Sequence, residues 1–492
     1  MMCVVYKSAK IDFRHHCCTL LTTGLGFCIV LFVENLTISS GIEEGVFMTD
    51  KREELVSGNI FKLMLKLGIP GIIGMLVISL YSFVDAVFVG RYVGDKALGA
   101  ISVAYAFTLI NNGIAVLIGM GSASILSRAV GRQDQKTVDA VMGNVFVLAV
   151  LMSSVVMIIG YLFAPQLLSL IGAEGGMHAM GVRYLRIVYL GSIFVNFGQA
   201  SNMVLRGEGR IALAMIIMGF GAVLNIALDA LFIIVLKQGI GGAAIATVIS
   251  QAVFALISFF YFLCFSKNVR FKTFRLEKSI VGETVAIGIS AMIMQVLALV
   301  QQTVMYATLK KYGGEDQVVL MGAFFRYLML SFIPLWGLSQ GFQPFVGTNF
   351  GAGLFDRVKK GTGMFYAFGL LLGLIAWGVF LMNPEKVLGL FIDNPALVAQ
   401  GKTNAVIAML IFPVLAVMIL NMTLFQAIGK PKPAGLLAIS RQLALFVPAV
   451  LILPHFFGAR GVWLAMPIVD GIVSVISIVI TIKVFATDLV KR

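Results

Sequence analysis

Two aspartates and an asparagine lie within otherwise apolar stretches of this chain. Asn225 and Asp229 are four residues apart in LNIALDALF, about one helical turn, so an α-helix would place them on one face. Asp85 lies in a separate apolar stretch, IPGIIGMLVISLYSFVDAVFVG. Placing an ionisable side chain in hydrocarbon costs at least about 2.5 kcal/mol. Two such groups indicate a site that binds a proton or a cation during transport.

The composition predicts that membrane-spanning helices position these groups. The chain has 492 residues, of which 59% are hydrophobic and only 12% are charged, and its mean hydropathy is +0.98. A soluble domain does not need that much apolar surface, so we expect a polytopic membrane protein in the lipid bilayer. The apolar stretches exceed about twenty residues, which predicts helices rather than the shorter strands of a β-barrel.

Twelve apolar spans follow one another from about residue 60. Their approximate limits are 62–88, 98–127, 138–164, 181–205, 211–236, 240–265, 280–309, 319–347, 361–382, 401–426, 433–454 and 459–484. Lys and Arg concentrate in alternate loops, above all in SKNVRFKTFRLEKS (266–279). This asymmetry predicts a cell (inner) membrane protein with both termini in the cytoplasm.

The two halves of the chain repeat at an offset of about 220 residues. GIGGAAIA (239–246) matches GARGVWLA (458–465), and EGRIALA (208–214) matches IGKPKPA (428–434). Six spans per repeat predict two six-helix bundles related by a pseudo-twofold along the membrane normal, with a V-shaped central cleft. We expect an N-terminal extension of doubtful status (1–47), an N-lobe with helices 1–6 (48–265), a cytoplasmic linker (266–279) and a C-lobe with helices 7–12 (280–492).

Several function classes are disfavoured. The net charge of +14 could suggest nucleic acid, but the basic residues lie in loops between spans, where membrane orientation explains them better. We find no nucleotide-binding loop, which argues against an ATP-driven pump. An integral-membrane lipid-modifying enzyme would need a clustered catalytic constellation, whereas the four His residues are scattered or lie in the extension. We therefore expect a transporter with no enzymatic activity, no cofactor and no metal beyond a coupling ion.

The chain also resembles a known family, the multidrug and toxic compound extrusion (MATE) transporters. The matching stretches run through both halves in order: P-x14-D (Pro70 to Asp85), VGRYVGDKALGAIS (89–102), RGEGR (206–210), N-x-x-x-D with GIGGAAIATVISQ (225–251), GLSQGFQPFVGTNFGAG (337–353) and GARGVWLAMPIVDG (458–471). The resemblance implies a two-lobed antiporter that exports organic, often cationic compounds in exchange for protons or sodium. A monomer is expected.

Prokaryotic members of that family carry a polar pocket in the N-lobe. The resemblance implies that its residues are Asp85, Asn225, Asp229 and Thr247. The residues themselves agree, because two neighbouring carboxylates in low dielectric cannot both stay ionised cheaply. The alternative is that the two acids are packing residues neutralised by a basic neighbour, although no basic residue lies mid-span in helices 1, 5 or 6. The oxygens of the cluster suit Na⁺ as well as H⁺, so the ion stays open.

A second mechanistic candidate is Pro70. Proline frees a backbone carbonyl and permits a kink in helix 1, either as a moving hinge or as a static bend. The substrate cleft would be lined by helices 1, 2, 7 and 8 and their neighbours, where aromatic and Met side chains suit varied organic cations. Each candidate could equally be a packing residue; they are Tyr81, Tyr105, Asn111, Asn112, Met292, Gln295, Met305, Phe324 and Tyr327.

The C-lobe departs from the other known pattern of the family, in which acids on helices 7 and 10 couple transport. Here helix 7 carries Gln in mid-span and helix 10 has no acid. Asp470 is the one deep acid of this lobe, and Arg326 and Arg441 are its candidate partners. A structural ion pair is favoured over substrate binding. A flippase for lipid-linked precursors remains an alternative function, although its anionic substrate should require more basic residues than these two.

Overall fold

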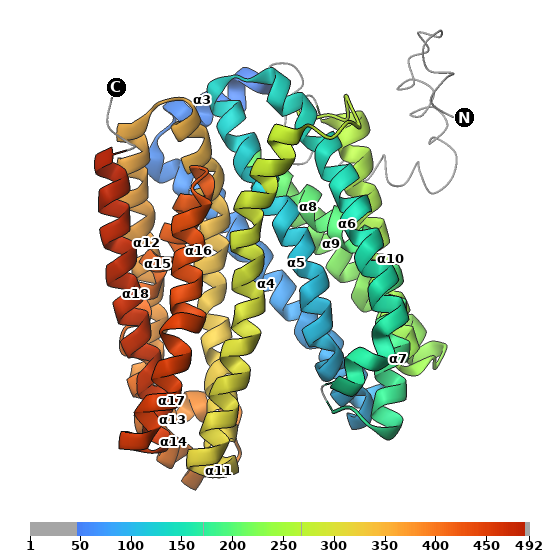
Figure 1. Cartoon of the computed structure of the whole chain (residues 1–492), viewed down its shortest axis with the longest axis vertical. Coiled ribbons are helices and arrows are strands. Elements are labelled where there is room, and N and C mark those ends of the chain that lie inside the picture. The colour runs from blue at the N-terminus through green and yellow to red at the C-terminus, as the bar shows by residue number, and fades with distance from the viewer. Residues whose placement is uncertain (1–46, 171, 267, 488–492) are drawn as a thin grey trace.

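The computed structural model describes residues 47–170, 172–266 and 268–487, and every regular element among them is helical. The predicted extension 1–47 lies, apart from Phe47, outside the described residues. A short helix, α3 (Phe47–Ser57), precedes two bundles. Figure 1 shows the first bundle in blue to green and the second in yellow to red, lying side by side. The all-α, two-lobed architecture predicted from the sequence is confirmed.

The N-lobe contains α4–α10. Its helices are α4 (Ile60–Tyr92), α5 (Asp95–Arg132), α6 (Gln135–Leu170), α7 (Gly175–Leu190), α8 (Ser192–Gly207), α9 (Ile211–Asp229) and α10 (Gly239–Phe260). A π-helical turn, η2 (Ala230–Val235), extends α9, and another, η3 (Tyr261–Phe265), extends α10. The helices α7 and α8 follow each other directly at Gly191, so together they form the span predicted near 181–205.

The C-lobe contains α11–α18. Its helices are α11 (Lys278–Gly351), α12 (Phe355–Met382), α13 (Pro384–Gly389), α14 (Pro395–Met409), α15 (Phe412–Ala427), α16 (Pro431–Ile439), η4 (Ser440–Ala444), α17 (Phe446–Phe457) and α18 (Ala459–Thr487). At 74 residues α11 is too long for one crossing, which takes about 20. It turns back at Gly314, whose φ of 70° suits glycine.

The number of spans is compatible with twelve. In the described residues nine helices are long and apolar enough to cross a membrane, and α14 with α15, bent by 43°, adds a tenth. The turn at Gly314 divides α11 into two crossings, and α7 with α8 supplies another. Both halves therefore begin and end at the same side, which is the side where α3 lies. We call it the α3 end.

Glycines let the two lobes pack closely at the α3 end. A Cβ added at Gly71 of α4 would lie within 3.0 Å of the backbone of Gly337 on α11, closer than real Cβ atoms come. Similar approaches across the lobes occur at the other members of this glycine seam, which are Gly121, Gly131, Gly288 and Gly351. Close backbone approach through small residues is the usual way for helices to associate within a membrane.

Polar contacts reinforce the seam. Arg128 of α5 forms a 2.7 Å ion pair with Glu283 at the start of α11, and Arg206 of α8 donates to Gln340 of α11 at 2.6 Å. The helix α3 bridges both lobes, because Arg52 donates to the Gly131 carbonyl of the N-lobe and the Leu55 carbonyl accepts from Arg357 of the C-lobe. The α3 end is therefore closed.

The faces of α5 and α11 that pack at the seam move apart from each other toward the end opposite α3. Ile110 precedes Gly121 by eleven residues and so lies within about 20° of it around α5. Leu330 precedes Gly337 by seven residues and also shares its face of α11 within about 20°. Yet Ile110 is 47% exposed and Leu330 is 54% exposed. Faces that pack at the seam are thus uncovered further along, in agreement with the diverging ribbons of Figure 1.

Candidate functional site in the N-lobe

The structure brings Asp85 and Asp229 together inside the N-lobe. Asp85 is half-buried on α4, and Asp229 is fully buried as the last residue of α9. Their carboxyl groups are within side-chain hydrogen-bonding reach of each other. The helix passes into the π-helical turn η2 directly after Asp229, a local geometry that is frequent at functional sites.

Asn225 and Thr247 complete the predicted set. With its amide oriented so that both ends are satisfied, Asn225 donates to Asp229 at 3.0 Å and accepts from the backbone N–H of Thr247 at 3.3 Å. Asn225 is buried, and Thr247 is half-buried on α10. One helical turn separates Asn225 from Asp229, as the sequence predicts, so the amide lies directly beside the carboxyl.

Neither carboxyl pairs with a basic side chain. In the part of the chain that the structure describes, no ion pair involves Asp85 or Asp229, and one buried oxygen of Asp229 has no hydrogen-bond partner. These contacts therefore do not support the alternative hypothesis that the two acids are packing residues neutralised by Lys or Arg. An oxygen cluster of this kind can hold a proton or a hard monovalent cation.

Two tyrosines lie beside the acids. Tyr81 of α4, predicted to line the substrate cleft, and Tyr184 of α7 are both close enough to Asp85 and Asp229 to interact electrostatically with them. Sequence reasoning missed Tyr184, because a tyrosine in a mixed stretch such as GVRYLRIVYL carries no signal of its own. The periodicity of α7 could at most have placed it on the face that packs into the lobe.

Comparison with known proteins identifies the family. Residues 70–231 and 290–451 both match the sequence model of MatE, and the two matches begin 220 residues apart, which is the offset of the internal repeat. The chain belongs to the MatE family. It is therefore a transporter rather than an enzyme, as the resemblance implied, and the repeat is a repeat of the family unit.

MatE relatives of known name cover most of the chain. The multidrug export protein MepA of Staphylococcus aureus (strain N315) is 26% identical over 425 residues, which are 86% of this chain and 93% of that protein. A protein of Shewanella oneidensis named FAD transporter is 24% identical over 430 residues, 86% of this chain and 95% of that protein.

Solved MatE structures have the same fold. One, described as the outward-facing conformation of a multidrug resistance MATE family transporter of the MOP superfamily, superposes with a TM-score of 0.83 at 24% identity. The match covers 92% of this chain and 100% of that one.

Within this MatE fold, Pro70 lies where α4 meets the C-lobe. The helix α4 continues through Pro70 without interruption, and Gly71 of the glycine seam follows it. A proline at this point leaves a carbonyl without its helical partner. Its role as a hinge remains a prediction, and its position next to the seam is where a bend would change the contact between the lobes.

The predicted cleft residues divide into two groups. Asn111, Met305 and Phe324 are buried inside the lobes and cannot line an open cleft: Asn111 accepts from Asn196, and Phe324 packs against Trp463. These three assignments are wrong. The helices that carry them are apolar nearly all round, so hydropathy does not fix their rotation. The other predicted members, which are not fully buried, are Tyr81, Tyr105, Asn112, Met292, Gln295 and Tyr327.

One of the two candidate partners of Asp470 pairs with it. Arg441 donates to both carboxylate oxygens of Asp470, at 2.7 Å and 3.3 Å, and both side chains are largely buried. Arg326 takes no part: its side chain is exposed, and it forms no ion pair with an acid in the described residues. Its assignment to a structural ion pair is wrong, because it lies on the face of α11 that points away from the C-lobe core.

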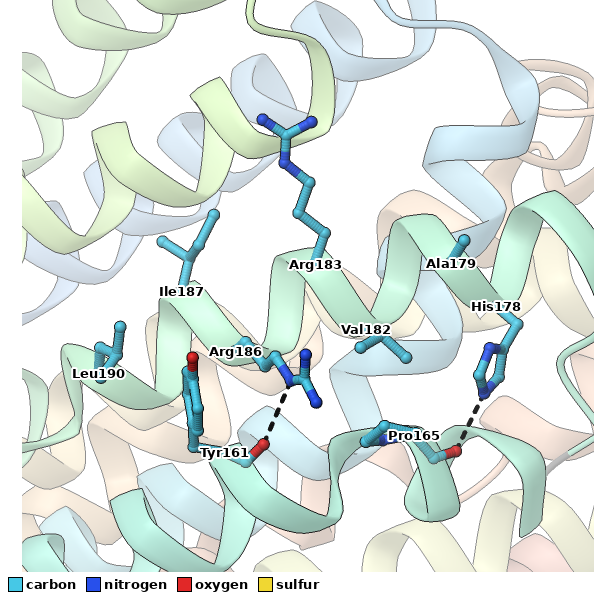
Figure 2. Close-up of a pocket in the computed structure, with 9 residues that line it drawn as sticks. All are labelled: Tyr161, Pro165, His178, Ala179, Val182, Arg183, Arg186, Ile187 and Leu190. Carbon is cyan, nitrogen blue, oxygen red and sulfur yellow. Dashed lines mark hydrogen bonds between the residues drawn. The ribbon is translucent and has the colours of Figure 1, made fainter.

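A pocket of about 500 Å³ lies apart from the carboxyl pair, between α6 and α7 (Figure 2). His178 contacts the Pro165 carbonyl at 3.0 Å, and Arg186 donates to the Tyr161 carbonyl at 3.4 Å. These contacts fasten α7 to α6. Of the predicted site residues, none lines this pocket.

Proposed function

We propose that this protein is a secondary active antiporter that exports organic, mainly cationic, compounds in exchange for H⁺ or Na⁺. The observation that carries the proposal is the Asp85–Asp229 pair in the N-lobe, with Asp229 buried and Asp85 half-buried, beside Asn225 and Thr247 and without a basic partner in the described residues. Buried ionisable groups within a membrane are costly and are retained for ion or proton binding. The name of the relative MepA supports multidrug export.

The coupling step follows from the closeness of the two carboxyls. When both carboxyls are ionised, their repulsion in low dielectric favours uptake of one H⁺, or of one Na⁺ held by the same oxygens. One bound monovalent cation lowers the charge of the pair from −2 to −1, so the N-lobe attracts an organic cation less strongly. Release of the ion on the other side of the membrane restores the charge, so import of one cation drives export of the other.

Alternating access would use the glycine seam. We propose that the α3 end faces the cytoplasm, because the loops at that end carry most of the Lys and Arg, and that both termini lie there. The described state is then open to the outside and closed at the seam. Rocking of the two lobes about the site would open the seam and expose it to the cytoplasm. Each chain holds both lobes, so we propose that a monomer transports.

Efflux from cells tests the proposal. Cells without their own exporters would be loaded with ethidium and energised, and initial efflux would be compared for the wild type, Asp229→Asn and Asp393→Asn. The last variant is the matched control, because Asp393 is an exposed acid of the loop before α14. We expect the wild type and the control to export ethidium and Asp229→Asn to lose energised export. Full efflux by Asp229→Asn would refute coupling at this pair.

A protonophore and Na⁺-free medium identify the ion in the same cells. Loss of efflux with the protonophore alone indicates H⁺, and loss without Na⁺ at constant membrane potential indicates Na⁺. If the wild type exports no organic cation at all, the assignment of the substrate class is wrong, whatever the behaviour of the variant.

A further inference from the structure

Arg326 is a mid-span arginine that the fold does not use for its own stability. It lies in the second crossing of α11, about 18 Å along the helix from the turn at Gly314. Arg441 alone pairs with Asp470, so Arg326 is left with no acidic partner in the described residues. An arginine that faces lipid at this depth is expensive, which favours a position in a water-filled space.

The rotation of α11 places Arg326 toward the N-lobe. Eleven residues separate it from Gly337 of the seam, so the two lie within about 20° of each other around the helix. The opposite face is buried in the C-lobe core over the whole crossing, through Phe324, Leu335 and Phe342. The face with Gly337 packs against α4 at the seam. Further along, the same face with Arg326 lines the space between the lobes.

The first crossing of α11 contributes hydrogen-bonding groups to the same wall. Tyr306 lies eighteen residues, or five turns, after Gly288 of the seam and therefore shares its face. Arg326 is close enough to the Tyr306 hydroxyl to interact electrostatically with it. Gln295 and Gln302 lie between Gly288 and Tyr306 within about 40° of that face, and all three side chains are half-buried. No acid lies between the seam and Tyr306 on the first crossing or between the seam and Arg326 on the second. Glu315 and Asp316 stand at the turn itself, where Glu315 pairs with Lys310 at 3.7 Å.

The charges of the two lobes are thus separated. Asp85 lies fourteen residues beyond Gly71, about 21 Å along α4, and Arg326 lies about 17 Å from Gly337 along α11. The acids of the N-lobe and the arginine of the C-lobe are therefore at similar distances from the closed end.

We propose that Arg326, with Tyr306 and Gln302, forms a subsite for an anionic group on the C-lobe wall. A guanidinium binds carboxylate, sulfonate or phosphate oxygens with two parallel N–H donors. Its ligands are aromatic compounds that carry such a group, above all zwitterions whose cationic part points to the N-lobe acids. This inference rests on the proposed export function and adds an anion-binding subsite to it.

Two dyes that differ only at the acid test the subsite. Rhodamine 6G is an ethyl ester with a fixed positive charge, and its free acid adds a carboxylate to the same ring system. Binding of both dyes to the purified full chain in lipid nanodiscs would be measured by fluorescence anisotropy, and their efflux would be measured in cells. The variants are Arg326→Gln, Arg326→Lys and, as a matched control, Arg91→Gln, which removes an exposed arginine at the end of α4.

We expect Arg326→Gln to weaken binding of the free acid by about tenfold or more, the effect of losing a charged hydrogen bond. Binding of the ester stays unchanged, Arg326→Lys recovers part of the loss, and Arg91→Gln matches the wild type. Equal weakening of both dyes, no weakening of either, or no binding of the free acid to the wild type would overturn the inference. Absence of ester efflux in the wild type would instead refute the proposed function, while the binding comparison still decides the subsite.

Discussion

Gly71 of α4 and Gly337 of α11 pack backbone to backbone across the two lobes, with no room for a side chain on either. This contact lies at the closed end of the molecule and next to Pro70 of the N-lobe. Any motion that opens the α3 end must separate these two glycines. The seam is therefore where the closed state can be disturbed without touching the carboxyl pair.

A methyl group at Gly337 should weaken closure. In Gly337→Ala the new Cβ would lie within 3.0 Å of backbone atoms of Ile72, which cannot rotate away. We expect a lower transport rate and greater reactivity of a cysteine introduced at the α3 end toward a membrane-impermeant maleimide added from that side. Gly322→Ala is the control on the same helix, because its Cβ would meet nothing within 4 Å. Equal behaviour of the two variants would show that the seam tolerates the methyl group.

A carboxylate at position 340 should lock the lobes together. Arg206 is 5% exposed and donates across the interface to the neutral Gln340. In Gln340→Glu the hydrogen bond becomes an ion pair, which we expect to strengthen the contact by about 1–2 kcal/mol. Thermal unfolding should then occur at a higher temperature and turnover should fall. Gln400→Glu, at an exposed position of α14, controls for the added charge; a faster Gln340→Glu transporter would contradict a role in closure.

Glu208, in the loop between α8 and α9, should make stability depend on pH. Burial raises the pKa of its carboxyl above the ordinary 4.5, against the opposing effects of Arg210 and Asn268. The folded protein therefore binds this proton more tightly than the unfolded chain does. The stability that this tighter binding contributes is complete below pH 4.5 and is lost as the pH rises through the pKa of the folded state. Unfolding temperatures would be measured from acid to alkaline pH, and Glu208→Gln should lose less stability than the wild type over that range. An equal loss of stability in the wild type and in Glu208→Gln over this pH range would contradict the raised pKa of Glu208. Glu385→Gln, which changes an exposed acid, is the control.

Asp470 should act in stability rather than in transport. In Asp470→Asn the guanidinium of Arg441 loses a bidentate partner, and both side chains are largely buried. Because the pair is partly exposed, we expect a loss of about 2 kcal/mol, less than for a fully buried pair. Replacing both Asp470 and Arg441 by leucine should restore most of the lost stability. Export that survives at low temperature supports this role, whereas a stable Asp470→Asn protein without export would assign Asp470 to the substrate path.

The sequence predicted the fold and the composition of the site well, for a physical reason. Asp85, Asn225 and Asp229 stand out in apolar stretches because membranes penalise polar groups, and the period of the helix places Asn225 beside Asp229. The structure brings these residues and Thr247 together, although their roles in coupling remain predictions. The length of the apolar stretches and the repeat likewise predict two six-helix lobes.

The rotation of the helices was harder to predict. Asn111 and Phe324 point into their lobes rather than into the cleft, and Arg326 points away from the core that contains Asp470. In a helix that is apolar nearly all round, the sequence pattern does not distinguish lipid, core and cleft faces. Tyr184 joins the acids only through the packing of α7, which has no local signal. Contacts between lobes, such as that of Gly71 with Gly337, require the tertiary structure.

Transport by purified protein tests the central claim most directly. Proteoliposomes would receive an imposed H⁺ or Na⁺ gradient, and ethidium transport against its own gradient would be measured for the wild type, Asp229→Asn and Asp393→Asn. We predict that one of the two ion gradients drives accumulation by the wild type and by Asp393→Asn, and that Asp229→Asn only equilibrates the dye. Accumulation by Asp229→Asn at the wild-type rate would contradict coupling through the Asp85–Asp229 pair.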